Sequence, residues 1–187
     1  MNKEKKSVSS QNILRMVTLS MMVAIGVVIS PMLRVEGFAP TAHLVNVVCS
    51  VLMGPWYSLL NGILTALIRM TLMSIPPLAI TGQVFGAVLS GLLYRWSKGR
   101  LIFASIGETI GTGIIGSIVS YPVMAYFVGK SGLTWFFYTP SFLIASTIGS
   151  LAGYLLLVTL RNNSNLYKMQ EKLGVQVYDR SRRNWKA

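Results

Sequence analysis

Long apolar stretches with few polar interruptions occupy most of the 187 residues and leave little sequence for a soluble domain. A helix that crosses a bilayer needs roughly 20 consecutive apolar residues. The pattern therefore predicts an all-α integral membrane protein, a bundle of six transmembrane helices at residues 13–33, 43–53, 57–74, 78–96, 101–128 and 135–160. The second segment is short and closed by Gly54-Pro55, so we expect half a span or a helix that begins in the preceding loop.

The first apolar run is too long for the apolar region of a signal peptide, so we interpret it as the first transmembrane helix. The chain then divides into an amino-terminal tail at 1–12, a six-helix membrane domain at 13–160 and a basic tail at 161–187. In that last tail, Leu166, Met169 and Leu173 have helical spacing. The spacing fits a short helix on the membrane surface, and an ordinary solvated tail is the alternative.

The distribution of Lys and Arg predicts the orientation, because cytoplasmic flanks are enriched in both residue types. With both termini in the cytoplasm, the two tails and the basic turn at 95–100 all lie inside. Only Arg34, Arg69 and Lys130 then lie toward the exterior. We therefore expect both termini to be cytoplasmic.

Composition agrees with a membrane protein. The mean hydropathy is +0.57 and charged residues make up 12% of the chain, against about 25% in an average soluble domain. The net charge of +12 resides in the tails and one turn and not on an amphipathic face with interleaved aromatic residues, which argues against nucleic acid. The single cysteine, Cys49, excludes an intramolecular disulfide and a multi-cysteine metal site.

No catalytic constellation is present in the sequence. There is no phosphate-binding loop with its lysine, no nucleophile motif, no paired carboxylates and no metal motif. We therefore predict no enzyme activity, no ATPase activity, no metal and no cofactor for this chain. If ATP drives its function, other subunits must supply the ATPase.

Glu108 is the one acid well inside a predicted span, and a buried carboxylate needs a cation, a donor network or a proton. It is either a ligand contact or the ion-pair partner of Arg69. The alternative is that it lies near the cytoplasmic end of its helix and reaches Arg95 or Arg100. The glycines around it, which include small-x-x-x-small spacing, predict tight helix packing.

Three further polar residues are candidates for a binding site. His43 and Asn46 lie three residues apart and therefore share a helix face, where both can hydrogen-bond a neutral heteroaromatic ring. Gln83 lies between two glycines, Gly82 and Gly86, near the predicted outer side. A structural hydrogen-bonding role is the alternative for each of them.

Aromatic residues flank the predicted spans, as expected for side chains that anchor helices at the membrane interface. Tyr121 and Trp135 lie close to the predicted outer mouth of the bundle. We single out these two as stacking partners for a flat ring.

The small size, the basic carboxyl tail and the polar groups near the outer side resemble the substrate-binding S components of energy-coupling-factor transporters. More specifically, four short motifs are similar to those of the ThiW family of carriers for the thiazole precursor of thiamin. They are Pro40-Thr-Ala-His43-Leu-Val-Asn46, Leu52-Met-Gly-Pro55, Gly82-Gln-Val-Phe-Gly86-Ala and Gly91-Leu-Leu-Tyr94-Arg. The resemblance extends from about Ile13 to Leu160.

This resemblance implies a protein of the bacterial plasma membrane that captures hydroxyethylthiazole from outside. It also implies three partners, namely a transmembrane coupling protein and two cytoplasmic ATPase subunits. S components pack on the coupling protein through an Ala-x-x-x-Ala motif in the first helix. The matching stretch here runs from Ser20 to Ala24, so serine replaces the first alanine, and both residues permit close helix approach.

Three other functions remain open at this point. The chain can be an S component for a different vitamin or small molecule. It can be an integral membrane enzyme that uses Glu108 and His43 as acid and base, although their predicted depths in the bilayer differ. It can also be an assembly or scaffold protein, for which the intramembrane polar residues have no evident purpose.

Overall fold

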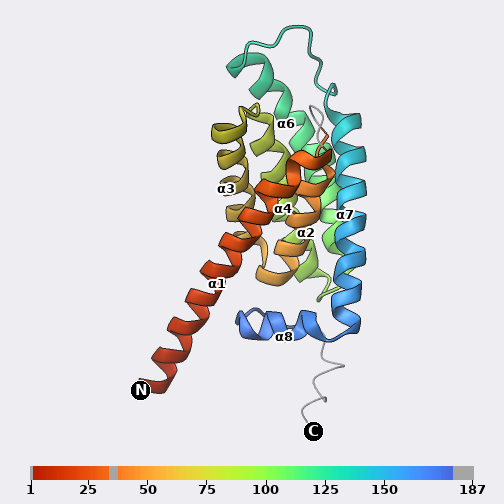
Figure 1. Cartoon of the computed structure of the whole chain (residues 1–187). Coiled ribbons are helices and arrows are strands. Elements are labelled where there is room, and N and C mark those ends of the chain that lie inside the picture. Colours follow the sequence, from red (N-terminus) through yellow and green to blue (C-terminus); the bar gives the residue numbers. More distant parts are fainter. Residues whose placement is uncertain (1, 34–37, 179–187) are drawn as a thin grey trace.

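The computed structural model describes residues 2–33 and 38–178, and these residues form a bundle of helices (Figure 1). Arg34 and the basic residues after 178 lie outside the described residues. The helices are α1 (Asn2–Ile29), α2 (Pro40–Met53), α3 (Pro55–Met73), α4 (Leu78–Trp96), α5 (Leu101–Ile110), α6 (Ser117–Pro122), α7 (Thr139–Asn162) and α8 (Asn165–Lys172). The described chain also contains one 3-10 helix, η1 (Ser30–Leu33), and two π-helices, η2 (Gly111–Gly116) and η3 (Val123–Phe127).

Each apolar segment that the sequence predicted corresponds to helix in the structure, with shifted ends. The second helix begins at Pro40, in the preceding loop, and ends before Gly54, whose φ of 89° takes the chain into α3. The fifth segment is one helical run at 101–127, built from α5, η2, α6 and η3. The last long helix begins at Thr139, four residues later than predicted, and α8 adds a helix to the predicted six within the described chain.

Four helices of the described chain are long and apolar enough to cross a membrane, namely Ser10–Met32, Leu78–Trp96, Leu101–Phe127 and Thr139–Asn162. The shorter apolar helix α2 lies at the centre, in contact with α1, α3, α4, α5 and α7. By contrast, only 17% of the α1 span is buried, and its amino-terminal half extends away from the bundle (Figure 1). The structure is thus all-helical through its described residues, with α2 as the packing centre.

Glycines allow α5 and η2 to lie directly against the backbone of α4. A Cβ atom at Gly107 would lie 2.6 Å from the carbonyl oxygen of Leu89, and one at Gly111 would lie 2.6 Å from that of Phe85. Cβ atoms in proteins essentially never come within 3.0 Å of a non-bonded atom, so a side chain at either position would force the helices apart. The predicted role of these glycines in tight packing is confirmed.

The short helix α8 lies across one end of the bundle, which we call the α8 end (Figure 1). Its buried Gln170 donates from Nε2 to the Val51 carbonyl at 2.8 Å and to the Tyr94 hydroxyl at 3.1 Å. The helical spacing suggested a short helix on the membrane surface, and the structure has a helix here, but Leu166 and Leu173 are buried in the core of the bundle whereas Met169 is 36% exposed. The carboxyl end of the described chain is therefore docked on the bundle.

Arg15 of α1 holds the end of α8. Its Nε donates to the Leu173 carbonyl at 2.6 Å and its Nη2 donates to the Gly174 carbonyl at 3.0 Å. These carbonyls follow the last turn of α8, where cationic donors are favoured. Arg15 thereby joins the first and last helices of the described chain.

Replacing Arg15 with alanine should loosen α8, because hydrogen bonds from charged donors contribute about 1.5–3 kcal/mol each when shielded and less when partly exposed, as here. We expect faster hydrogen exchange of the amides at 165–175, measured by mass spectrometry on the purified protein. Met16→Ala is the matched control, because Met16 is 67% exposed on the same helix. Unchanged exchange in Arg15→Ala would contradict this role.

Candidate functional site

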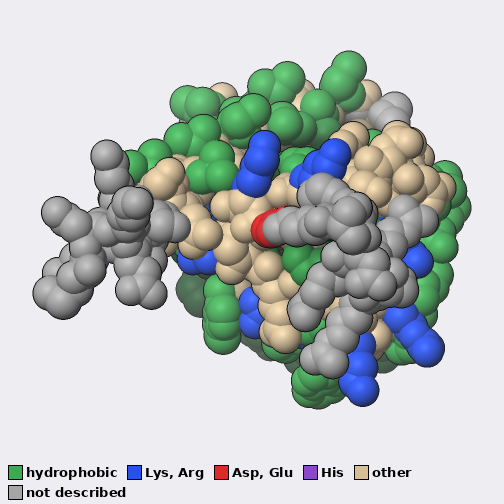
Figure 2. Space-filling model, turned by 90° about the horizontal axis from the view of Figure 1, so that it is seen from below, with side chains coloured by type: hydrophobic (Ala, Val, Ile, Leu, Met, Phe, Trp, Pro, Cys, Tyr) green, Lys and Arg blue, Asp and Glu red, His purple; other side chains and the backbone are tan. Residues whose placement is uncertain are grey.

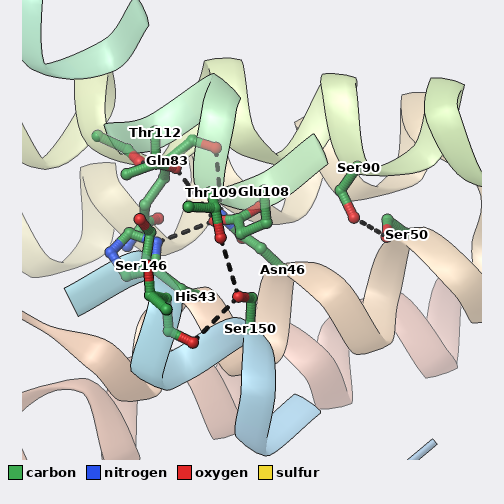
Figure 3. A network of polar contacts seen from close by, with 12 residues as sticks. His43, Asn46, Ser50, Gln83, Ser90, Glu108, Thr109, Thr112, Ser146 and Ser150 are labelled. Atoms are coloured by element: carbon green, nitrogen blue, oxygen red, sulfur yellow. Dashed lines mark hydrogen bonds and ion pairs between the residues drawn. The ribbon is translucent and has the colours of Figure 1, made fainter. Parts of the chain in front are cut away.

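A polar cluster lies inside the bundle around the carboxylate of Glu108, which is fully buried (Figure 3). Its Oε1 atom accepts hydrogen bonds from Asn46 Nδ2 at 3.1 Å and from Thr112 Oγ1 at 3.2 Å. His43 Nδ1 lies 2.9 Å from the same oxygen. One carboxylate oxygen therefore gathers three side chains from two different parts of the chain.

The local sequence explains how these side chains meet. His43 and Asn46 project from one face of α2, as their spacing predicted, and Thr112 follows Glu108 by one helical turn at the start of η2. Gly86 of α4 leaves the room that the cluster needs. A Cβ atom at this position would lie 2.7 Å from Glu108 Oε1 and would overlap Thr112 Oγ1.

Gln83 extends the cluster toward α3. Asn46 Nδ2 donates to the Gln83 backbone carbonyl at 3.2 Å. In the amide orientation that matches donors with acceptors, Gln83 Nε2 donates to the Gly62 carbonyl and Oε1 accepts from Arg69 Nη1, both at 2.9 Å. Arg69 is buried as well. Its hydrogen bond to Gln83 connects it to the Glu108 cluster.

The structure pairs Glu108 with His43, whereas the sequence suggested Arg69 or the cationic residues at 95 and 100. The contact is an ion pair when His43 is protonated and a hydrogen bond to an uncharged imidazole otherwise. Both side chains are more than nine-tenths buried. Burying a polar or charged side chain costs free energy unless it has a hydrogen-bonded partner, and these two side chains are partners of each other.

Three buried side-chain oxygens in α3 and α5 have no hydrogen-bond partner among the described residues, namely Glu108 Oε2, Asn61 Oδ1 and Thr65 Oγ1. An unsatisfied buried polar atom costs about 1–3 kcal/mol, so native proteins leave few of them. A ligand that carries a hydroxyl or an N–H group supplies the donor that Glu108 Oε2 lacks. Glu108 Oε2 is therefore an acceptor of the cluster that no described side chain satisfies.

Tyr121 and Trp135 contact each other, with ring centroids 4.5 Å apart and the ring planes tilted by 40°. They lie at the end of the bundle opposite α8, where the chain passes from α6 to α7 (Figure 1). Trp135 is 53% exposed, so the pair presents aromatic surface at that end. No hydrogen bond among the described residues joins it to the Glu108 cluster.

The sequence did not single out Thr112, although its one O–H lies within hydrogen-bond distance of two acceptors, the Gly82 carbonyl at 2.9 Å and Glu108 Oε1 at 3.2 Å. Its position four residues after Glu108, on the same helix face, could have indicated that the two side chains meet. A second polar set links α5 to α7, where Thr109 and Ser150 form a hydrogen bond of 3.1 Å between their hydroxyls (Figure 3). This hydrogen bond is made by Thr109, the residue next to Glu108, and does not involve the Glu108 carboxylate.

The Glu108 cluster thus gathers polar side chains inside an apolar bundle. The chain also matches one family of known proteins. The family model described as "Thiamine-precursor transporter protein (ThiW)" matches residues 16–163. The chain belongs to the ThiW family. Searches among curated proteins and among solved structures gave no match.

Membership of the ThiW family makes this chain a membrane transport protein for a small molecule, and not a member of an enzyme family. The matched region extends from α1 to the end of α7 and includes every member of the Glu108 cluster. It excludes α8, which begins at Asn165. The resemblance that the sequence motifs indicated is thereby confirmed.

Proposed function

We propose that this ThiW-family chain is the substrate-binding S component of an energy-coupling-factor transporter and captures hydroxyethylthiazole from outside the cell. The observation that carries the proposal is the buried carboxylate of Glu108. One of its oxygens is held by three side chains, and the other has no partner among the described residues. A transported ligand would bring the missing donor.

The chemistry of the ligand matches the cluster. Hydroxyethylthiazole is small, flat and neutral, with a hydroxyl group that donates and a ring nitrogen that accepts. In our proposal the hydroxyl donates to Glu108 Oε2 and the ring nitrogen accepts from His43 or from the Arg69 guanidinium. Asn46 and Gln83 hold these groups in place, and the Tyr121–Trp135 pair offers an aromatic surface near the entrance.

The proposed orientation places the six apolar segments predicted from the sequence in the membrane and both termini in the cytoplasm. It is supported by the Lys and Arg side chains around the α8 end (Figure 2). The start of α1 lies at the same end of the bundle as α8 (Figure 1). Under the positive-inside rule that end faces the cytoplasm, and the Tyr121–Trp135 end faces the exterior of a bacterial plasma membrane.

The proposed contact with a coupling protein involves Ser20 and Ala24 of α1. Both residues are exposed, and the large apolar side chains of Val17, Met21 and Val28 nearby are exposed as well. Ser20 Oγ donates to the Met16 carbonyl at 3.0 Å, so its hydroxyl is satisfied within the helix. A small-residue face of this kind allows another helix to approach closely, while the two ATPase subunits would be separate chains.

Calorimetric titration of the purified protein with hydroxyethylthiazole tests the proposed substrate. Thiamin, its pyrimidine precursor, riboflavin and biotin serve as competitors. We expect heat from the thiazole alone and no displacement by the others. Selective binding of another compound in the panel would retain an S component but overturn its assignment to thiazole, and no binding at all would contradict the substrate-binding role.

A further inference from the structure

A hollow of about 510 Å³ lies at the turn that joins α4 to α5, away from the Glu108 cluster. The turn belongs to the α8 end, because Tyr94, just before it, accepts a hydrogen bond from Gln170 of α8. The hollow is lined by Leu93, Trp96, Ser97, Lys98, Arg100 and Phe103. It thus combines cationic and apolar side chains at one end of the bundle.

The backbone of the turn holds the two cations on either side of a glycine. Lys98 and Gly99 have φ values of 56° and 89°, and the Gly99 amide donates to the Tyr94 carbonyl at 3.0 Å. Lys98 and Arg100 are both exposed. A guanidinium and an ammonium group that line one hollow suit a phosphate, which accepts hydrogen bonds from both.

The apolar surroundings distinguish a lipid from a soluble phosphate. Trp96 in the hollow is 77% exposed, and indole rings favour the boundary between head groups and acyl chains. Ile102, Ile106 and Ile110 continue from the hollow along α5 at four-residue spacing, and they are 47%, 41% and 39% exposed. This spacing places them on one helix face, where an acyl chain can lie.

We propose that this hollow binds the phosphate head group of an anionic phospholipid, with an acyl chain along the exposed isoleucines of α5. The site would fix the height of α4 and α5 in the inner leaflet, where anionic lipids attract basic residues. The proposal requires that the α8 end lie at a bilayer surface. It does not depend on which ligand the Glu108 cluster binds.

Native mass spectrometry of the full-length protein in detergent, with phosphatidylglycerol or phosphatidylcholine added at equal concentrations, tests the proposal. We expect the wild type to retain phosphatidylglycerol in preference. The double variant Lys98→Gln/Arg100→Gln should weaken this binding about tenfold to thirtyfold, since each cation near a membrane surface contributes about 1 kcal/mol. Lys168→Gln/Lys172→Gln is the matched control, because it removes equal charge from exposed positions on α8.

Three results would overturn the site. Equal retention of both lipids by the wild type would show that the hollow does not select an anionic head group. Equal losses in the two double variants would indicate diffuse attraction to the whole basic face. Displacement of the lipid by the water-soluble head group glycerophosphoglycerol at similar concentration would assign the hollow to a soluble phosphate, whereas failure of that compound to compete supports the acyl-chain contact.

Discussion

Glu108→Gln is expected to weaken hydroxyethylthiazole binding by about 2–3 kcal/mol, roughly fiftyfold, because a hydrogen bond to a charged acceptor is lost. Glutamine keeps the size of the side chain. Its carbonyl oxygen can still accept from Asn46 and Thr112, but an NH₂ group then replaces Oε2. The ligand hydroxyl would meet a donor where it now meets an acceptor.

Calorimetric titration measures this loss, and thermal unfolding in detergent shows whether the variant stays folded. Thr109→Val is the matched control, because Thr109 is the next residue and its hydroxyl interacts with Ser150 of α7 instead of the carboxylate. We expect this control to bind the thiazole as the wild type does. An unchanged affinity in Glu108→Gln, or an equal loss in Thr109→Val, would remove Glu108 from the site.

Gly86→Ala is expected to disrupt both the cluster and ligand binding. The added methyl group would lie 2.7 Å from Glu108 Oε1 and 2.8 Å from its carboxylate carbon, and it would overlap the Thr112 hydroxyl. Overpacking of a filled interior costs about 1–3 kcal/mol, and relief requires Glu108 to move away from His43 and Asn46. We therefore expect a lower unfolding temperature together with weaker thiazole binding.

Gly62→Ala provides the control, since it adds the same methyl group to the neighbouring helix α3. There the nearest atom is the Cβ of Gln83 at 3.5 Å, which is ordinary van der Waals contact. This variant should keep its unfolding temperature and its affinity near the wild-type values. If Gly86→Ala also keeps both, the close contact of α4 with the Glu108 cluster is not needed for binding.

Much of the helical framework could be predicted from the sequence, because the information is local. The length of each apolar run and the turn residues at its ends, such as Gly54-Pro55, delimit the helices within a few residues. Helical spacing likewise predicted that His43 and Asn46 share a face, and the structure places both against Glu108. Family membership also follows from motifs that are short and contiguous.

The partners of Glu108 could not be predicted in this way. The sequence offered Arg69, but the structure supplies His43 and Thr112 and connects Arg69 through Gln83. The choice depends on the relative height and rotation of α2, α4 and α5. These heights and rotations depend on the glycines that let one helix pack directly against the backbone of the next.

The sequence by itself therefore determined the class of the protein, its helices and its family, since apolar length, helical spacing and short motifs are properties of neighbouring residues. The tertiary structure decided which polar side chains form one site and which, like Tyr121 and Trp135, lie at another end. The physical reason is close packing: Gly86, Gly107 and Gly111 bring α4 and α5 together, and that distance selects the contacts of Glu108.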